Sequence, residues 1–366
     1  MDVKFADFLR QYEFIKQDIN NAIQGVLDSG WYIMGNELDR FEHEFAGYIG
    51  SKYAVGCASG TEAIALALMA IGVGNGDEVL TVPNTAVPTA TGISMTGAVP
   101  TFVDIDPKTL MMDIKLVEQR ISEKTKAIIP VHLFGSSVDL GPLIEIASTY
   151  NIPIIEDCAQ SCGTEYGGRK TGSIGCCGTF SFYPSKNLGC YGDGGAVTTN
   201  DEVLYEKLKM LRNYGQVRRY HHASPGINSR LDEIQAAILR VKLTKLDEWN
   251  RRRNHIAEMY RECLQNLPVI IPSLLKENKH SYHLYVILVE EREKFVQYLQ
   301  SEGIQTLIHY PIPVHMQEVY KCLGNQKGDF PIAERVAEQI VSLPMWPELT
   351  DEEINYVCKK ISAFFA

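Results

Sequence analysis

Several features that would assign the chain to a simple class are absent from its 366 residues. No apolar run approaches the roughly 18 residues that a membrane-spanning helix needs. Residues 1–17 mix charges with single apolar side chains, unlike a signal peptide. The net charge is −10, and the densest basic run, Arg251–Arg253, has acidic neighbours. We therefore expect no membrane span, no nucleic-acid partner and a cytoplasmic location.

The nine cysteines contain no C-x-x-C pair, the spacing typical of zinc sites. Cys176 and Cys177 are adjacent, Cys158 and Cys162 are four residues apart, and the others are scattered. An odd, scattered set favours free thiols in a reducing compartment. We therefore predict neither a bound metal nor a disulfide framework. No internal repeat or low-complexity tract is evident.

Short apolar runs alternate with helical patterns from residue 50 to about residue 200. The runs are rich in β-branched and aromatic residues and lie at 53–57, 78–82, 101–105, 127–132, 152–156, 179–183 and 196–199. Helical patterns separate several of them, at 61–71, 140–150 and 201–213. This alternation predicts an α/β fold with a mostly parallel sheet and helices on both faces. Ligands of such sheets bind beyond the carboxyl ends of the strands.

The second part of the chain has a different pattern. A helical stretch covers residues 231–267, and strands are expected at 282–289 and 304–310. Further helices are expected at 291–301, 333–341 and 351–365. We predict a large domain over residues 1–245 and a small α+β domain over residues 246–366.

The first candidate site is Ser59-Gly60-Thr61-Glu62, which follows an expected strand and precedes an apolar helical pattern. Free backbone N–H groups and the helix dipole at such a position attract an anion. Glycine lets the chain approach a phosphate closely, and Thr61 adds a hydroxyl group. The same residues would also form an ordinary helix N-cap, so this segment alone leaves both interpretations open.

The second candidate site is Glu156-Asp157-Cys158-Ala159-Gln160, at the end of an apolar strand. A carboxylate at a sheet edge can pair with a pyridinium nitrogen and keep the ring electron-withdrawing. Asp157 is the better candidate because small residues follow it and leave room for a flat ring. A strand-end aspartate that caps a helix is the alternative.

The third candidate site is Lys186, between the strand at 179–183 and the glycine-rich turn Gly192-Asp193-Gly194-Gly195. A partly desolvated lysine there has a lowered pKa and can form a Schiff base. Ser181 is placed to reach a phosphate. A surface-loop lysine is the alternative, which the apolar strand and the glycines make less attractive.

The nearby run Gly167-Gly168-Arg169-Lys170-Thr171-Gly172 looks like a phosphate-binding loop. However, Arg169 stands where such a loop has lysine, and no helical pattern follows. We predict a surface hairpin at this position instead.

Together, the three candidate sites resemble those of the DegT/DnrJ/EryC1/StrS family of sugar aminotransferases. The family has the PLP-dependent transferase fold type I, the aspartate-aminotransferase fold. The matching segments run in order over nearly the whole chain: Gly30–Gly35, Ser59–Thr61, Val103–Asp106, Glu156–Gln160, Phe180–Lys186, Leu211–Gly215, Gly226–Leu231, His309–Pro311 and Leu343–Met345. So many ordered matches favour the cofactor interpretation at all three sites.

The resemblance implies that pyridoxal 5'-phosphate (PLP) binds Lys186 as a Schiff base and that Lys186 then moves a proton. Asp157 would pair with the pyridine nitrogen, and Gln160 would lie close to the ring. The cofactor phosphate would be bound by Gly60, Thr61 and Ser181.

The resemblance also implies a homodimer with shared sites, because Asn228 would reach the phosphate of the other subunit. Two positions depart from the family pattern. Ile227 stands where the family commonly has tyrosine, and Ala86 stands where many members have an aromatic residue stacking on the cofactor.

The reaction implied is transfer of an amino group from L-glutamate to a nucleotide-linked keto-sugar. Thr85-Ala86-Val87 and Tyr183 resemble members that aminate C3, so we expect a dTDP-linked 3-keto-6-deoxyhexose as the acceptor. The candidates for binding the sugar are Tyr183, His309 and Tyr310. His309 and Tyr310 are also candidates for proton relay, since histidine titrates near neutrality.

Other functions stay open at this point. A 4-keto-sugar or a keto-inositol is an alternative acceptor. Relatives that dehydrate sugars replace the lysine with histidine, so Lys186 disfavours dehydration. Intact Lys186, Asp157 and Ser181 also disfavour a non-catalytic regulator built on this fold.

Overall fold

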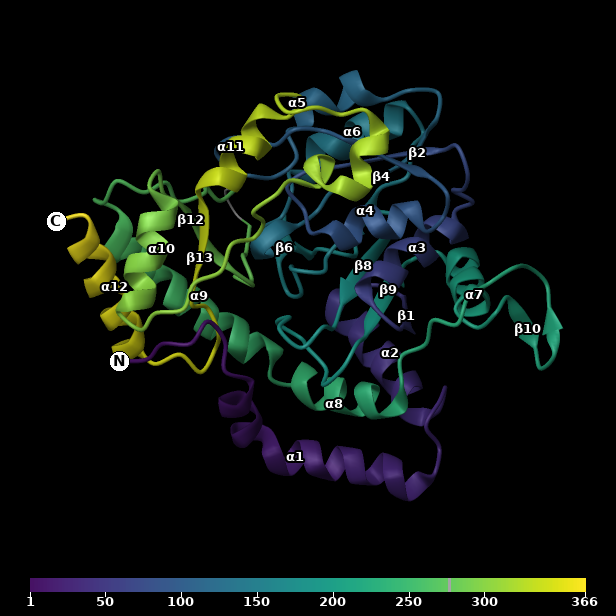
Figure 1. Ribbon diagram of the computed structural model, residues 1–366. Helices are drawn as coiled ribbons and strands as arrows, with labels where there is room; N and C mark the ends of the chain where they lie inside the picture. The colour runs from purple at the N-terminus through teal and green to yellow at the C-terminus, as the bar shows by residue number, and fades with distance from the viewer. Residues whose placement is uncertain (276–277) are drawn as a thin grey trace.

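A mixed β-sheet forms the centre of the computed structural model, which describes residues 1–275 and 278–366 (Figure 1). Four strands pair in the order β1-β9-β8-β5, and three pair in the order β3-β2-β4. Parallel bridges Ile128↔Ile154 and Val131↔Asp157 join the two groups into one sheet. The strands are β1 (Tyr53–Cys57), β2 (Glu78–Thr81), β3 (Val99–Phe102), β4 (Thr125–Ile128), β5 (Ile155–Asp157), β8 (Cys177–Ser181) and β9 (Gly195–Thr199).

Among these strands only β9 runs antiparallel to its neighbours, so the predicted α/β class with a mostly parallel mixed sheet is confirmed. Several strands end earlier than predicted, for example β3 at Phe102 and β4 at Ile128. The apolar runs extend past the ladders because the loops at the carboxyl edge are buried as well, as Val103 and Val131 illustrate.

Helices cover both faces of the sheet, as predicted. Alternation along the strands sends neighbouring residues to opposite faces: Ala54 packs toward α2 and α8, whereas Val55 packs toward α3 and α7. The helices of this part are α1 (Phe8–Ser29), α2 (Asn36–Ile49), α3 (Gly60–Ala70), α4 (Val87–Ser94), α5 (Ile114–Val117), α6 (Leu140–Thr149), α7 (Glu202–Leu211) and α8 (Glu233–Leu243). Helix α1 lies outermost and packs on α8 through Ile15 and Ile19 (Figure 1).

The C-terminal part differs from the prediction in three places. The single helix expected over 231–267 is two helices, α8 and α9 (Leu246–Leu264), because the chain turns at Thr244 and Lys245. The helix expected to reach residue 341 is α11 (Pro331–Gln339), and Ile340 begins strand β13 (Ile340–Leu343). Apolar residues continue across that boundary, so periodicity does not mark it.

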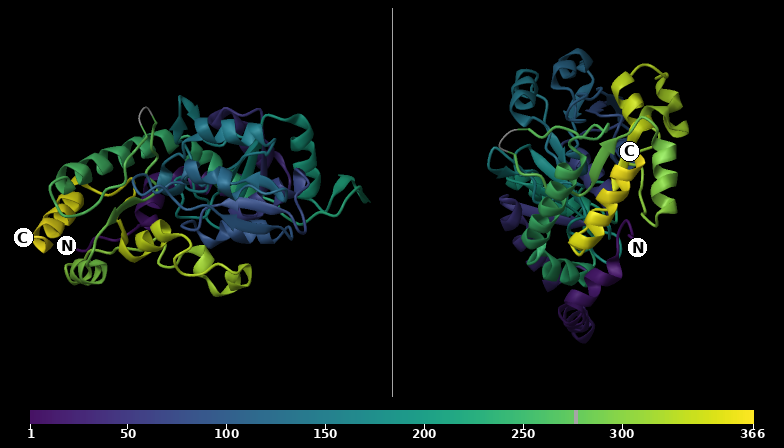
Figure 2. Two further views of the ribbon diagram at one scale, coloured as in Figure 1. Left: turned by 90° about the horizontal axis from the view of Figure 1, so that it is seen from above. Right: turned by 90° about the vertical axis from the view of Figure 1, so that its left-hand side faces the viewer.

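The third difference concerns residues 304–310, where the predicted strand was wrong. The structure has only the isolated bridges Val3↔Ile304 and Leu307↔Ser342 there. Strand β12 (Tyr285–Leu288) instead pairs antiparallel with β13. Helices α10 (Arg292–Ser301) and α12 (Asp351–Phe364) pack around this pair, close to both chain termini (Figures 1 and 2).

Two hairpins extend from the body of the chain. Strands β6 (Glu165–Tyr166) and β7 (Arg169–Lys170) form the surface hairpin predicted in place of a phosphate-binding loop. Its two central glycines, Gly167 and Gly168, both have positive φ, as a tight hairpin turn requires. Strands β10 (Gln216–Arg218) and β11 (His221–His222) form the second hairpin, which projects away from the sheet (Figure 2).

The domain boundary predicted near residue 245 falls at the break between α8 and α9 and stays a prediction. Residues of α11 and Leu284 pack in the same cluster as Leu80 and Phe102 of the sheet. The C-terminal part is therefore in extensive contact with the larger part. None of the described helices is both long and apolar enough to cross a bilayer.

Candidate active site

A cavity of about 530 Å³ lies at the carboxyl edge of the sheet. It is lined by the loops that follow β1, β2, β4, β5 and β8, and by residues of the C-terminal part. The sheet topology places these loops side by side although they are up to about 130 residues apart in the chain. The predicted site residues that line the cavity are Gly60, Thr61, Asp157, Gln160, Ser181, Tyr183, Lys186, His309 and Tyr310.

Lys186 lies in the loop that follows β8, and its backbone N–H donates to the carbonyl of Tyr183 at 2.8 Å. Burial of the amine lowers the pKa of Lys186 to about 8, and the negative charge of Asp157 opposes this effect. A neutral amine is therefore far more accessible near neutral pH than in an exposed lysine. This is the electronic state that a nucleophilic lysine needs.

Asp157 ends strand β5 and is buried. One carboxylate oxygen accepts a hydrogen bond from the Thr89 hydroxyl at 2.8 Å, and the other accepts from the Ala159 N–H at 3.0 Å. Burial raises the pKa of Asp157, while these hydrogen bonds and the charge of Lys186 act in the opposite direction. The carboxylate is thus fixed in direction but lacks a strong charge partner within the described chain.

Glu156, the other carboxylate considered at this strand end, has a different environment. Its oxygens accept from the N–H groups of Gly172, Ile174 and Gly175 at 2.7–2.9 Å, and from His132 Nε2 at 3.0 Å. Burial alone would raise the pKa of Glu156, but these donors outweigh it and hold the pKa below its ordinary value. Glu156 is therefore fully engaged inside the protein, and Asp157 is the carboxylate available to a ligand.

The turn between β1 and α3 approaches β8 very closely. A Cβ atom at Gly60 would lie 2.6 Å from Cβ of Ser181, so no residue with a side chain fits there without displacing Ser181. Ser59 caps α3 by accepting from the Glu62 N–H at 3.2 Å. The segment is therefore an N-cap, and Thr61 and Ser181 beside it line the cavity. Its binding of an anion stays a prediction.

Gln160, His309 and Tyr310 also line the cavity. Gln160 accepts from the Phe134 N–H at 2.7 Å and donates to the Tyr310 hydroxyl at 2.9 Å. Burial raises the pKa of Tyr310 to about 12. Burial, together with the charge of Lys186, lowers the pKa of His309 to about 4.

The lowered pKa of His309 favours one of its two predicted roles, orienting the sugar, over proton relay. His309 was a candidate for proton relay on the ground that histidine titrates near neutrality, whereas in this site the ring is neutral at pH 7. Its Nδ1 is 2.8 Å from the Ser342 hydroxyl, so the ring is held in place by a hydrogen bond. A neutral, oriented imidazole suits a hydrogen-bonding role toward a ligand.

Asn228 is the one predicted site residue that does not line the cavity. It is exposed, and its backbone bridges to Asn213 beside the β10–β11 hairpin. Tyr183, by contrast, lines the cavity but remains 56% exposed at its mouth.

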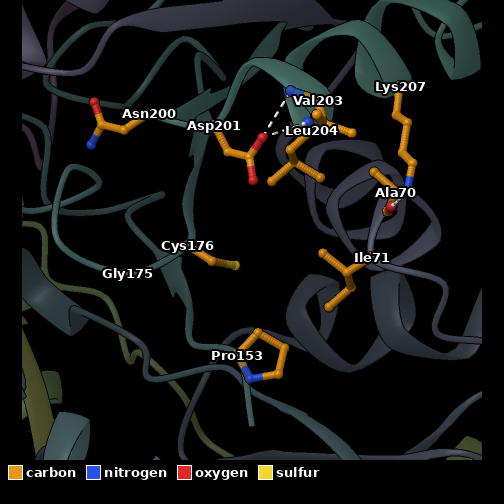
Figure 3. Close-up of a pocket in the computed structure, with 10 residues that line it drawn as sticks. All are labelled: Ala70, Ile71, Pro153, Gly175, Cys176, Asn200, Asp201, Val203, Leu204 and Lys207. Atoms are coloured by element: carbon orange, nitrogen blue, oxygen red, sulfur yellow. Dashed lines mark hydrogen bonds between the residues drawn. The ribbon is translucent and has the colours of Figure 1, made fainter. Parts of the chain in front are cut away.

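A second hollow of about 590 Å³ lies at the other end of the strands (Figure 3). Pro153, Cys176 and Asn200 contribute to it from the starts of β5 and β8 and the end of β9. Its charged groups are already bound within the protein: Asp201 accepts from the N–H groups of α7, and Lys207 Nζ is 3.4 Å from the Ala70 carbonyl. The two hollows have similar volumes, and the convergence of Lys186 and Asp157 favours the first as the reactive site.

Sequence reasoning missed several residues that the fold brings to the cavity. Thr89, at the start of α4, holds Asp157, and no motif marks it. His283 lines the cavity and contacts Asn187, the residue after Lys186. The available signal for His283 was a histidine at the head of the otherwise apolar run at 282–289.

The different environments of Glu156 and Asp157 predict that replacing each carboxylate by an amide has a different effect on stability. His132 Nδ1 accepts from the Val138 N–H, so Nε2 carries the proton and donates to Glu156. In Glu156→Gln the amide NH₂ group would oppose the donors at one oxygen position. We expect a loss of at least about 2 kcal/mol in the free energy of unfolding.

Asp157→Asn is the matched control, because it removes a buried charge and keeps both hydrogen bonds possible. We expect its stability to be unchanged or raised. Thermal and urea unfolding of ligand-free protein measure both effects. Equal destabilisation by the two substitutions would contradict the assignment of Glu156 to structure and Asp157 to a ligand.

Comparison with known proteins agrees with this geometry. The model of the DegT/DnrJ/EryC1/StrS aminotransferase family matches residues 13–362. The chain is 45% identical to the dTDP-3-amino-3,6-dideoxy-alpha-D-galactopyranose transaminase of Aneurinibacillus thermoaerophilus, over 99% of each chain. It is 42% identical to the "pleiotropic regulatory protein" of Geobacillus stearothermophilus, over 100% of this chain and 99% of that protein.

Among solved structures, the chain is similar to S. venezuelae DesV in complex with a ketimine intermediate. The TM-score is 0.98 at 42% identity, with 99% of this chain and 98% of the other covered. The match over nearly the full length, together with the lysine and aspartate that meet in one cavity, leads to one conclusion: the chain belongs to the DegT/DnrJ/EryC1/StrS aminotransferase family.

Proposed function

We propose that this chain is a PLP-dependent aminotransferase that moves an amino group from L-glutamate to a dTDP-linked 3-keto-6-deoxyhexose. The product would be a dTDP-3-amino-3,6-dideoxyhexose. The observation that carries the proposal is the placement of Lys186 and Asp157 on one cavity at the carboxyl edge of the sheet. The related A. thermoaerophilus transaminase, whose name contains a 3-amino-3,6-dideoxy sugar, supports the choice of acceptor.

The cavity fits the cofactor in size and in its donor set. At one end, the N-terminus of α3 offers backbone N–H groups, and Thr61 and Ser181 offer hydroxyl groups, which is the chemistry that binds a phosphate. Because Gly60 has no side chain, the backbone of this turn can approach a phosphate closely. Asp157 offers a fixed carboxylate to a ring nitrogen, and Ala159, two residues later, lines the cavity with a small side chain.

PLP, when bound, supplies a ring that withdraws electrons from the carbon where a proton is lost or gained. Asp157 would keep the ring nitrogen protonated, and that cation would in turn compensate the buried carboxylate. Thr89 would keep the carboxylate directed at the nitrogen. Lys186 would hold the cofactor covalently and, once released, would carry the proton with an amine whose pKa is about 8.

Tyr183, His309 and Tyr310 are proposed to bind the sugar. All three side chains line the cavity, and the tyrosines bring hydroxyl groups suited to sugar hydroxyls. Ala86, at the start of α4, leaves room beside the cofactor that an aromatic residue would fill. This room, together with Tyr183 near Lys186, is the basis for proposing amination at C3.

An assay with three acceptors tests the proposed substrate. L-Glutamate is supplied with dTDP-3-keto-6-deoxyglucose, its galacto epimer or dTDP-4-keto-6-deoxyglucose, and the 3-keto sugars are generated in the same vessel by an isomerase. We expect kcat/KM for one 3-keto sugar to exceed that for the 4-keto sugar at least about a hundredfold. Amino-sugar formation is followed by mass spectrometry.

Lys186→Ala is the control in this assay, and it should form no amino sugar. Efficient amination of the 4-keto sugar alone would reject the C3 assignment. Turnover of a keto-inositol instead would move the acceptor to another class. Wild-type protein inactive with every keto compound would favour a regulatory role such as the name of the G. stearothermophilus relative suggests.

We also propose that the enzyme is a homodimer in which each site uses Asn228 of the other subunit. Within one chain, Asn228 lies outside the cavity that holds the other predicted site residues. Large apolar side chains are exposed near it on the projecting hairpin, including Val217 and Tyr220, and on the segment Trp31–Met34. Exposed apolar residues of this kind are typical of surfaces that a partner covers.

Mixing two inactive variants tests the shared site. Lys186→Ala and Asn228→Ala are combined under conditions that allow subunit exchange. If Asn228 acts across the interface, one site of each heterodimer has both residues intact, and about a quarter of wild-type activity should return at equal mixing. Exchange is verified with differently tagged subunits, and a mixture that exchanges yet stays inactive would contradict sharing.

A further inference from the structure

His283 is a buried histidine that lines the cavity next to the predicted catalytic residues. It lies just before strand β12, on a segment held by Arg253, whose Nη1 donates to the carbonyls of Tyr282 at 3.0 Å and His283 at 3.3 Å. Its ring nitrogen Nδ1 is 3.2 Å from Oδ1 of Asn187. The backbone at His283 and one edge of its ring are thus held by hydrogen bonds.

The hydrogen bonds of Asn187 determine which ring nitrogen carries the proton. The Nδ2 group of Asn187 donates to Asn250 Oδ1 and to the Ser281 carbonyl, both at 2.8 Å. This arrangement identifies the nitrogen end of the amide, so Oδ1 faces His283 and can only accept. His283 Nδ1 must therefore donate, and in the neutral ring Nε2 keeps a free lone pair.

The charges around His283 keep the ring neutral. The charged and titratable groups that act on it are Lys186, Arg253 and His309, and none of them is an acid. Burial, reinforced by these groups, lowers the pKa of His283 well below its ordinary value. At neutral pH the ring accordingly offers an acceptor, not a second cation.

Nε2 has no protein hydrogen-bond partner among the described residues, and the cavity that His283 lines also contains the Lys186 amine. Asn187, which orients the ring, is bonded directly to Lys186 in the chain. The buried amide of Asn187 therefore anchors the ring and also the backbone next to Lys186. An amine is the complementary donor, since the N–H groups of a buried amine need acceptors.

We propose that His283 is a positioning residue whose Nε2 accepts a hydrogen bond from the Lys186 amine whenever Lys186 is not bound to the cofactor. This inference rests on the proposed function, because it concerns the half of the reaction in which Lys186 is free. The hydrogen bond would fix the direction of the amine lone pair. It would also stabilise the ammonium form that Lys186 takes after accepting a proton.

Two substitutions separate the two nitrogens of the ring. His283→Asn keeps a donor at the position of Nδ1 and loses the acceptor at Nε2. His283→Gln can place its amide oxygen near the position of Nε2 and keeps the acceptor. Thermal unfolding identifies any variant that is inactive because it does not fold. Among folded variants, the pair distinguishes loss of the acceptor at Nε2 from mere loss of the histidine side chain.

The test uses the full-length protein loaded with pyridoxamine 5'-phosphate, in which Lys186 is free. Lys186 is acetylated with a trace of reagent at a series of pH values, and the labelled peptide is quantified by mass spectrometry to obtain the pKa of the amine. We expect His283→Asn to lower the pKa of Lys186 by about one relative to wild type, because the ammonium loses an acceptor. His283→Gln should stay close to wild type.

Turnover gives the second readout. With the acceptor found for wild type, kcat should fall about tenfold or more in His283→Asn with little change in KM, and His283→Gln should recover most of it. The inference is overturned if the folded variants share the wild-type pKa of Lys186, or if the two substitutions act alike. Labelling requires no sugar turnover, so an inactive wild type would reject the proposed function without deciding the role of His283.

Discussion

The site depends on one electrostatic constraint: a lysine amine and an aspartate carboxylate are held on the same buried cavity with few other charges near them. Burial pushes both groups toward their neutral forms, which lowers the pKa of Lys186 to about 8 and raises the pKa of Asp157. Each buried group would lower the free energy of unfolding if no ligand compensated its charge. The protein retains them at the point where a cofactor with a phosphate, a ring nitrogen and a carbonyl group would compensate both.

Desolvation alone does not select Lys186. The pKa of Lys242 is also lowered to about 8, again mainly by burial. Its Nζ, however, donates to the Gly189 carbonyl at 2.7 Å and lies 4.1 Å from the centre of the Tyr191 ring. Lys242 thereby supports the loop that carries Lys186, whereas Lys186 lines the cavity. The same distinction separates Glu156 from Asp157. Glu156 is held by hydrogen bonds from the protein, whereas Asp157 lines the cavity and is available to a ligand.

Much of this could be predicted from the sequence. Alternation of apolar runs and helical patterns predicted the mostly parallel α/β sheet. Glycine with a hydroxyl residue, a strand-end aspartate and a loop lysine predicted the centre of the site. The family resemblance added Gln160, Tyr183, His309 and Tyr310, which line the same cavity. The rest could not be predicted because it depends on contacts between distant segments. Thr89 meets Asp157 across 68 positions, and His283 meets Asn187 across 96. The neutral state of His309 likewise follows from burial and from Lys186, not from its own neighbours in the chain.

The central claim is that Lys186, and no other lysine, carries the cofactor. Borohydride reduction of the PLP-loaded protein, followed by proteolysis and mass spectrometry, fixes the cofactor to the lysine that holds it. The modification should lie on the peptide that contains Lys186 and should disappear in Lys186→Ala. Stoichiometric modification of Lys242 or Lys207 with Lys186 unmodified would contradict it.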